Sequence, residues 1–187
     1  MMAKRFKKVS SYEEWLQPKL VDNIFPLLSK ELPKYREKIK TLHLCFSTDP
    51  YMYGHPEICR ASTQIIEKAN VFGVHCSVLT KGILPIELAN MPLENEYGIT
   101  VVTLDENFRM EMEPGAAPME ERIRALEALS EHGCYTWISI EPYPTPNIHE
   151  QNLDQLLERV SFANRIIFGR LHYNKQVTAY KDYQNFL

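Results

Sequence analysis

The sequence predicts an α/β fold in which parallel strands alternate with helices, and three observations support this prediction. Short apolar runs rich in Val, Ile, Thr and aromatic residues recur along the chain, which is typical of strands buried in a sheet. Segments with helical periodicity lie between them, so that strands recur at intervals of roughly 25 to 36 residues, as in βα units. Polar and charged residues follow the strands.

The expected strands combine apolar and β-branched residues, and they are residues 41–47, 74–80, 99–104, 135–141 and 165–169. Five strands cannot close a regular eight-stranded barrel. The alternation alone therefore leaves two architectures open, an open doubly wound sheet and part of a βα barrel.

The clearest helix is expected at residues 118–133. It begins at Pro118 and ends at Gly133, which are favoured start and stop residues, and Ile123 and Leu126 fall at helical spacing within it.

Three further segments show helical periodicity, namely residues 12–32, 56–73 and 148–162. Pro26 predicts a kink or a break in the first of these. No linker-like or low-complexity segment interrupts the pattern, so residues 1–187 are expected to form a single domain.

Unusual residues follow every expected strand at its carboxyl end. In parallel α/β folds these ends share one edge, and that edge carries ligands and chemistry. Polar loops also cap helices, so one such loop indicates little. Five of them favour a binding rim, because Lys81, Glu141 and Arg170 are not capping residues.

Composition narrows the function classes. The 187 residues suffice for one domain, and a formal net charge of -3 argues against a general nucleic-acid binder. The basic opening, residues 4–8, is interpreted as a solvated end. No apolar stretch approaches the ~20 residues of a membrane span, and no secretory signal is recognisable, so no membrane partner is expected and a cytoplasmic location is the default.

The cysteines are Cys45, Cys59, Cys76 and Cys134, and their spacing does not match a metal-binding knuckle. Structural thiols are the favoured interpretation. A zinc site with His43 or His75 is less favoured, because zinc ligands usually cluster more tightly. No metal ligand is therefore predicted in this chain.

Seven segments, taken in order, carry a family resemblance: KRFKKVSSYEEWLQPKLV, HLCFSTDPYMYG, VLTKG, ENEYGITVVTL, EPGAAPMEERIRALEALSEHGC, SIEPYPTPN and FGRLHYNK. With them the chain resembles radical SAM proteins of the branch related to spore photoproduct lyase, and most of all those called radical SAM mobile pair protein B. The resemblance covers nearly the whole chain. It implies a partial (βα) barrel of the radical SAM type, with parallel strands and outer helices.

The chain departs from this family in one respect. The family's chemistry depends on a Cys-x3-Cys-x2-Cys motif that holds a four-iron four-sulfur cluster, and the cluster in turn binds S-adenosylmethionine. This sequence contains no such motif. The resemblance therefore implies a fragment that lacks the first strand and the cluster loop. We expect it to be inactive alone, whereas the intact parent would carry out 5'-deoxyadenosyl radical chemistry.

The resemblance also assigns cofactor-binding residues to the rim. Ser47, Thr48 and Asp49 take the place where the family contacts the amino group of S-adenosylmethionine. Lys81 resembles the lysine that meets the cofactor carboxylate, and Thr103 resembles the hydroxyl residue that bonds the same group. Even without the family, Asp49 and Lys81 would supply an anionic and a cationic corner for a zwitterion.

Other residues of the rim are expected on the adenine and substrate side. Ser139 and Glu141 match the cofactor-binding region of the fifth family strand. The substrate-side candidates are Tyr51, Arg122, Asn147, Arg170 and Asn174. Arg122 and Glu113 either orient the preceding loop or form a surface ion pair.

Expected partners are the small-molecule cofactor, a second radical SAM protein of a pair and, by family analogy only, a nucleic acid. Two alternatives stay open. One is a cluster-free lyase or hydrolase with Asp49 and Glu141 as acid and base and Lys81 as electrophile. The other is a degenerate, non-catalytic chain that binds a partner subunit.

Loop aromatics are expected to pack rather than to stack on bases; they are Tyr51, Tyr53, Tyr143, Tyr173 and Trp137.

Overall fold

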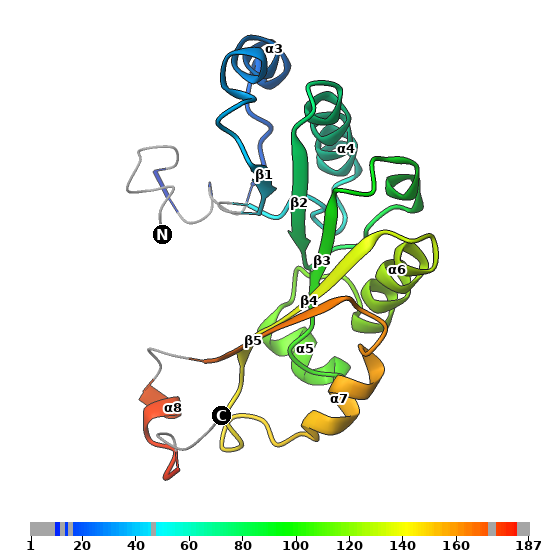
Figure 1. Cartoon of the computed structure of the whole chain (residues 1–187). Coiled ribbons are helices and arrows are strands. Elements are labelled where there is room, and N and C mark those ends of the chain that lie inside the picture. Colours follow the sequence, from blue (N-terminus) through cyan, green and yellow to red (C-terminus); the bar gives the residue numbers. More distant parts are fainter. Residues whose placement is uncertain (1–9, 12–13, 15–16, 46–47, 172–174, 183–187) are drawn as a thin grey trace.

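A computed structural model describes residues 10–11, 14, 17–45, 48–171 and 175–182 (Figure 1). One sheet contains five strands in the order β1-β2-β3-β4-β5, and every neighbouring pair is parallel. The strands are β1 (Thr41–Leu44), β2 (His75–Thr80), β3 (Glu96–Thr100), β4 (Tyr135–Tyr143) and β5 (Arg165–Arg170). The predicted α/β fold with parallel strands is confirmed.

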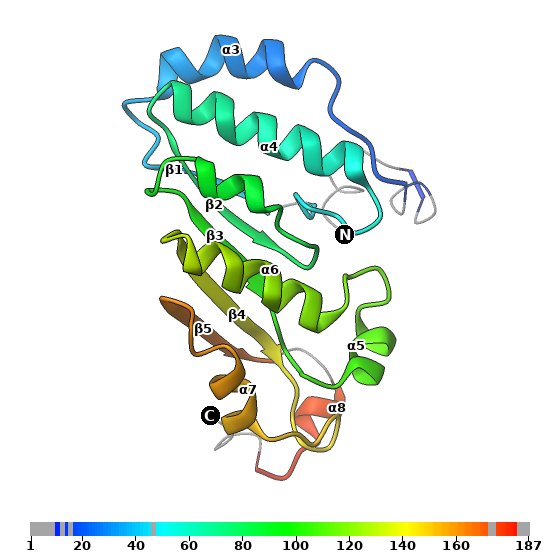
Figure 2. The same ribbon diagram turned by 90° about the vertical axis from the view of Figure 1, so that its right-hand side faces the viewer.

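Helices alternate with the strands, and most of them lie on one side of the sheet. They are α3 (Ile24–Tyr35), α4 (Pro56–Val71), the 3-10 helix η1 (Ile86–Asn90), α5 (Glu106–Met112), α6 (Met119–Glu131), α7 (Leu153–Arg159) and α8 (Lys175–Thr178). Helices α4, α6 and α7 lie on the same side of the sheet, whereas α8 lies on the other (Figures 1 and 2). This one-sided cover is the arrangement of consecutive right-handed βα units.

The core lies between the sheet and these helices. Val78, Ile99 and Ile138 alternate with residues of the opposite sheet face, and each is 0% exposed. Ile123 and Leu126, which were expected on the apolar side of the helix at 118–133, are also 0% exposed and belong to the same cluster. Each such side chain contributes about 1.5–3 kcal/mol through its burial.

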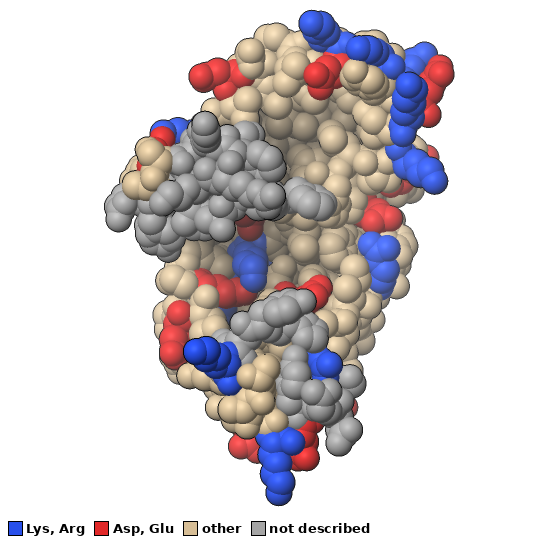
Figure 3. Space-filling view, turned by 90° about the vertical axis from the view of Figure 1, so that its left-hand side faces the viewer, with Lys and Arg blue, Asp and Glu red and all other residues tan. Residues whose placement is uncertain are grey.

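The opposite face of the sheet is mostly polar, and we call it the inner face. The register places Ser77 beside Glu96 on this face, and Thr100 beside Ser139. Figure 3 shows this face hollowed, with acidic and basic side chains together inside the hollow.

The helix predicted at 12–32 is confirmed only in its second part, from residue 24 onward. Residues 17–23 are not helical, and α3 begins at Ile24, after Asn23 adopts a left-handed φ of 60°. Pro26 lies in the first turn of α3, where no intrahelical hydrogen bond is lost, so it does not divide a longer helix.

The strand predicted at 99–104 is shifted, because β3 covers Glu96–Thr100. In the sheet, the indole of Trp137 lies against Gly98, and a Cβ at position 98 would come within 2.3 Å of the indole Cε2 atom. Gly98 is therefore a packing requirement inside a strand.

Candidate functional site

The carboxyl ends of β1 and β2 are joined by the carboxylate of Asp49. Its Oδ1 accepts hydrogen bonds from the Tyr51 backbone N–H (2.9 Å) and from the Thr80 hydroxyl, and its Oδ2 accepts one from the Lys81 backbone N–H (2.7 Å). A carboxylate has about four acceptor positions, so one remains on Asp49. Asp49 fixes the shape of the rim as well as its charge.

The loops after β1 and β2, which Asp49 links, are also in close backbone contact. A Cβ at Gly82 would lie 1.6 Å from the Tyr51 carbonyl oxygen, so the loops after β1 and β2 can touch only because residue 82 is glycine. Tyr51 is 0% exposed, its hydroxyl lies 3.2 Å from Thr63 Oγ1, and burial raises its pKa. Tyr51 was expected on the substrate side, but its side chain packs in the core.

The Lys81 side chain, which follows β2, is the outermost of three charged side chains that are linked by ion pairs. Its Nζ pairs with Glu113 Oε1, and Glu113 Oε2 lies 3.1 Å from Arg122 NH2. The side chains are 38%, 10% and 0% exposed in the order Lys81, Glu113, Arg122. The cationic corner predicted at Lys81 is thus already paired with an acidic side chain.

Arg122 anchors this chain from inside the protein. Its Nε donates to the Ala117 carbonyl (2.8 Å) and its NH1 to the Thr100 carbonyl at the end of β3 (2.9 Å). Burial lowers the pKa of Arg122, and the charge of Glu113 opposes that shift. The interpretation of Arg122 and Glu113 as a surface ion pair is wrong, because the guanidinium is fully buried.

Thr103 lies three residues beyond β3 and is 0% exposed. Its Oγ1 accepts from the Asp105 N–H (3.0 Å) and lies 3.2 Å from His149 Nε2. The His149 ring stacks on Phe108 with centroids 4.0 Å apart. The sequence argument did not identify His149, which holds the loop after β4 against the loop after β3.

Ser139 and Glu141 both lie on β4, where the predicted strand is confirmed. Ser139 is 6% exposed on the inner face. Glu141 is exposed and precedes a cis Glu141–Pro142 peptide bond. Its carboxylate lies against Gly169 of the neighbouring strand, where a Cβ would be 2.6 Å from Oε1.

The remaining predicted residues are spread around the rim. Asn147 donates through Nδ2 to the Gln176 carbonyl (2.9 Å), and Arg170 is half-buried at the end of β5. Thr48 is exposed beside Asp49. Ser47 and Asn174 lie outside the described residues.

The loop aromatics mostly pack, as predicted. Trp137 is 4% and Tyr143 5% exposed, whereas Tyr53 is 45% exposed. Tyr173 lies outside the described residues.

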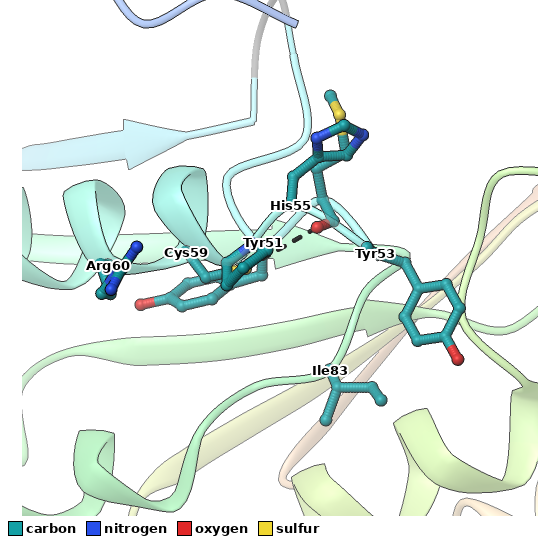
Figure 4. Close-up of a pocket in the computed structure, with 9 residues that line it drawn as sticks. Tyr51, Tyr53, His55, Cys59, Arg60 and Ile83 are labelled. Carbon is teal, nitrogen blue, oxygen red and sulfur yellow. Dashed lines mark hydrogen bonds between the residues drawn. The ribbon is translucent and has the colours of Figure 1, made fainter.

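A shallow cavity of about 320 Å³ lies beside this rim, at the start of α4. Figure 4 shows its lining, which includes Tyr51, Tyr53, His55, Cys59, Arg60 and Ile83. The Cys59 thiol donates to the Met52 carbonyl across 3.7 Å. Tyr51 is the only residue of this lining that had been predicted as a site residue.

Cysteine contacts in the described part of the chain are local. Cys76 and Cys134 are buried, and Cys45 Sγ lies 2.9 Å from His43 Nε2. Burial raises the pKa of the Cys45 thiol. Among the described residues, no group of three or more His, Cys, Asp or Glu could hold a metal ion, so these residues do not supply an iron–sulfur cluster site.

Comparisons with known proteins bear on this geometry. No family model matches the chain. It is 27% identical over 152 residues to an uncharacterized protein, ORF301, of Acidianus two-tailed virus, with 78% of this chain and 48% of that protein covered. The chain thus spans about half the length of this curated relative.

Solved structures of Streptococcus suis SuiB match the fold. The crystal structure of SuiB superposes with a TM-score of 0.55 at 14% identity, over 80% of this chain and 34% of SuiB. SuiB bound to S-adenosylmethionine matches with the same TM-score at 13% identity, over the same shares of the two chains. The chain therefore shares the fold of SuiB. The predicted partial barrel is confirmed, whereas the spore photoproduct lyase branch stays a prediction.

No helix in the described part of the chain has the length and apolar character needed to span a membrane.

Proposed function

We propose that the rim formed by the loops after β1, β2 and β3 binds S-adenosylmethionine through its amino acid end. The observation that carries this proposal is the arrangement around Asp49 and Lys81. One carboxylate fixes the two loops, and the neighbouring ammonium reaches the surface of the rim with 38% of its side chain exposed. The crystal structure of SuiB with S-adenosylmethionine, a protein of the same fold, supports the choice of ligand.

The chemistry of the rim suits a zwitterion. Lys81 can donate to a carboxylate, and a charge-assisted bond of this kind is about twice as strong as a neutral one. The remaining acceptor position of Asp49 and the exposed hydroxyl of Thr48 suit an ammonium group. Ser139 and Glu141 would then face the rest of the ligand from β4.

Thr103 fits this site in an indirect role. Its hydroxyl is buried and engaged by Asp105 and His149. We therefore assign it to holding the loop after β3 in place.

Radical chemistry goes beyond this proposal. It needs an iron–sulfur cluster, and the described residues do not fit one. A second radical SAM protein and a nucleic acid stay predictions from the family resemblance.

The cluster-free lyase or hydrolase receives less support from the geometry. Asp49 already accepts three hydrogen bonds, so only one acceptor position of its carboxylate remains for a reacting proton. A Schiff-base lysine attacks through a free amine, whereas the Lys81 amine is engaged by Glu113.

Isothermal titration calorimetry with S-adenosylmethionine tests the proposed function. We expect Lys81→Glu to weaken binding at least about tenfold, since reversing the charge replaces an attraction with a repulsion of several kcal/mol. Lys34→Glu makes the same charge change on exposed α3 and should bind like the wild type. Equal affinity of Lys81→Glu and Lys34→Glu would refute the site.

A further inference from the structure

Lys81, Glu113 and Arg122 form a chain in which Glu113 has two cationic partners. One oxygen of Glu113 meets Lys81 and the other meets Arg122 at 3.1 Å. Among the described ion pairs, Lys81 has Glu113 as its only acidic partner. The two ends of the chain therefore differ in how freely they can exchange partners.

The inner end is fixed. Arg122 is 0% exposed, and its Nε and NH1 atoms also donate to two backbone carbonyls. If Glu113 moved away, a buried guanidinium would lose its acidic partner, which is strongly destabilising. Glu113 is therefore held where it is.

The outer end can change. The Lys81 side chain is 38% exposed, and its ammonium has three donors on a flexible stem. If Lys81 turns to another carboxylate, Arg122 still compensates the charge of Glu113. Exchange at Lys81 thus leaves no buried charge unpaired.

We propose that Glu113 competes with the ligand for Lys81. A ligand carboxylate binds the rim by replacing Glu113 as the partner of the Lys81 ammonium, while Glu113 stays paired with Arg122. This inference rests on the proposed function of the rim and adds a residue that sets its affinity. The competition weakens the binding of every carboxylate ligand and leaves ligands without a carboxylate unaffected.

The ratio of two affinities measures this competition. S-adenosylmethionine carries the amino acid carboxylate, whereas 5'-methylthioadenosine shares the nucleoside and lacks the amino acid. We expect Glu113→Gln to raise the affinity for S-adenosylmethionine relative to 5'-methylthioadenosine by roughly two- to fivefold, the value of a partly exposed ion pair.

Two more variants control this experiment. Glu106→Gln removes a carboxylate from the same region, where it pairs with Arg109, and should leave the ratio unchanged. Glu113→Asp keeps a negative charge for Arg122 and shortens the reach to Lys81, so it should fold even if Glu113→Gln does not, and should also raise the ratio. A ratio that stays constant or falls in a folded Glu113 variant overturns the proposal.

A second readout does not depend on S-adenosylmethionine. Acylation of Lys81 by an amine-reactive ester, followed by mass spectrometry, reports access to its amine. We expect both Glu113 variants to be acylated faster at Lys81 than the wild type, and Glu106→Gln to match the wild type. Unchanged acylation refutes the competition, whereas faster acylation in a protein that binds no S-adenosylmethionine refutes only the proposed ligand.

Discussion

Gly82 follows Lys81 directly and lies against the backbone of the loop after β1. A Cβ there would be 1.6 Å from the Tyr51 carbonyl oxygen and 3.2 Å from the Thr80 hydroxyl. The first of these atoms belongs to the backbone and cannot turn aside. This single position therefore determines whether the Asp49 joint can form.

Gly82→Ala should lower the free energy of unfolding by about 3 kcal/mol or more, since two backbone segments must separate. Urea titration followed by circular dichroism measures this change. Gly115→Ala is the matched control, because no atom lies within 4 Å of a Cβ at that position, and its change should stay within about 0.5 kcal/mol. Similar losses in the two variants would contradict the steric argument.

Cys76 is a second residue whose surroundings give a measurable effect. It lies on β2 and is 0% exposed, and burial raises the pKa of its thiol from 9.0 to about 12. Because the folded value lies above the unfolded one, the stability contributed by the neutral thiol is complete below pH 9. It is lost as the pH rises from 9 towards 12.

Between about pH 8 and pH 10, wild-type protein under reducing conditions should lose about 1.4 kcal/mol more stability than Cys76→Ala, the value of one proton bound over one pH unit. Urea titrations of both proteins at the two pH values measure the difference. Parallel losses would show that this thiol ionises equally in the folded and unfolded chains.

At the scale of elements, the loop between β4 and α7 depends on His149. Its ring stacks on Phe108 and lies 3.2 Å from the Thr103 hydroxyl, and Gln151 Nε2 donates to the Val102 carbonyl (2.9 Å). The Ile148 and His149 amides bond the Thr145 carbonyl. These contacts fasten a loop without regular structure to the end of β3.

His149→Ala should lower the stability by about 1 kcal/mol, the value of a stacked ring pair, and should speed amide hydrogen exchange in residues 144–152. Mass spectrometry of peptides covers this segment. His75→Ala replaces an exposed histidine on β2 and should leave the exchange of residues 144–152 unchanged. Unaltered exchange after loss of His149 would mean that other contacts hold the loop.

At the scale of the whole molecule, helices cover one face of the sheet and leave the inner face open. Figure 3 shows acidic and basic side chains together in the hollow of this inner face. On β5 the side chains of Ile166, Ile167 and Phe168 are 37–38% exposed. The superposition on SuiB covers 80% of this chain and 34% of SuiB.

Local sequence determined the order of elements. Four expected strands and the helices at 56–73 and 118–133 lie where the periodicity placed them, because alternating apolar residues need a core on one side. Strand direction then follows from the helical crossovers, which brings the polar ends to one rim. Lys81 and Asp49 could be found from this logic alone.

Only the tertiary structure decided how those residues are used. The sequence does not show that Asp49 bonds the backbone of the next loop, that Glu113 takes Lys81, or that Arg122 is buried, because these partners are 9 to 32 residues apart. The bounds expected for β3 were also wrong, because Gly98 lies inside this strand, where it packs against the indole of Trp137, a residue far away in the sequence. Periodicity records the burial of each residue, whereas pairing between loops depends on how the sheet aligns their ends.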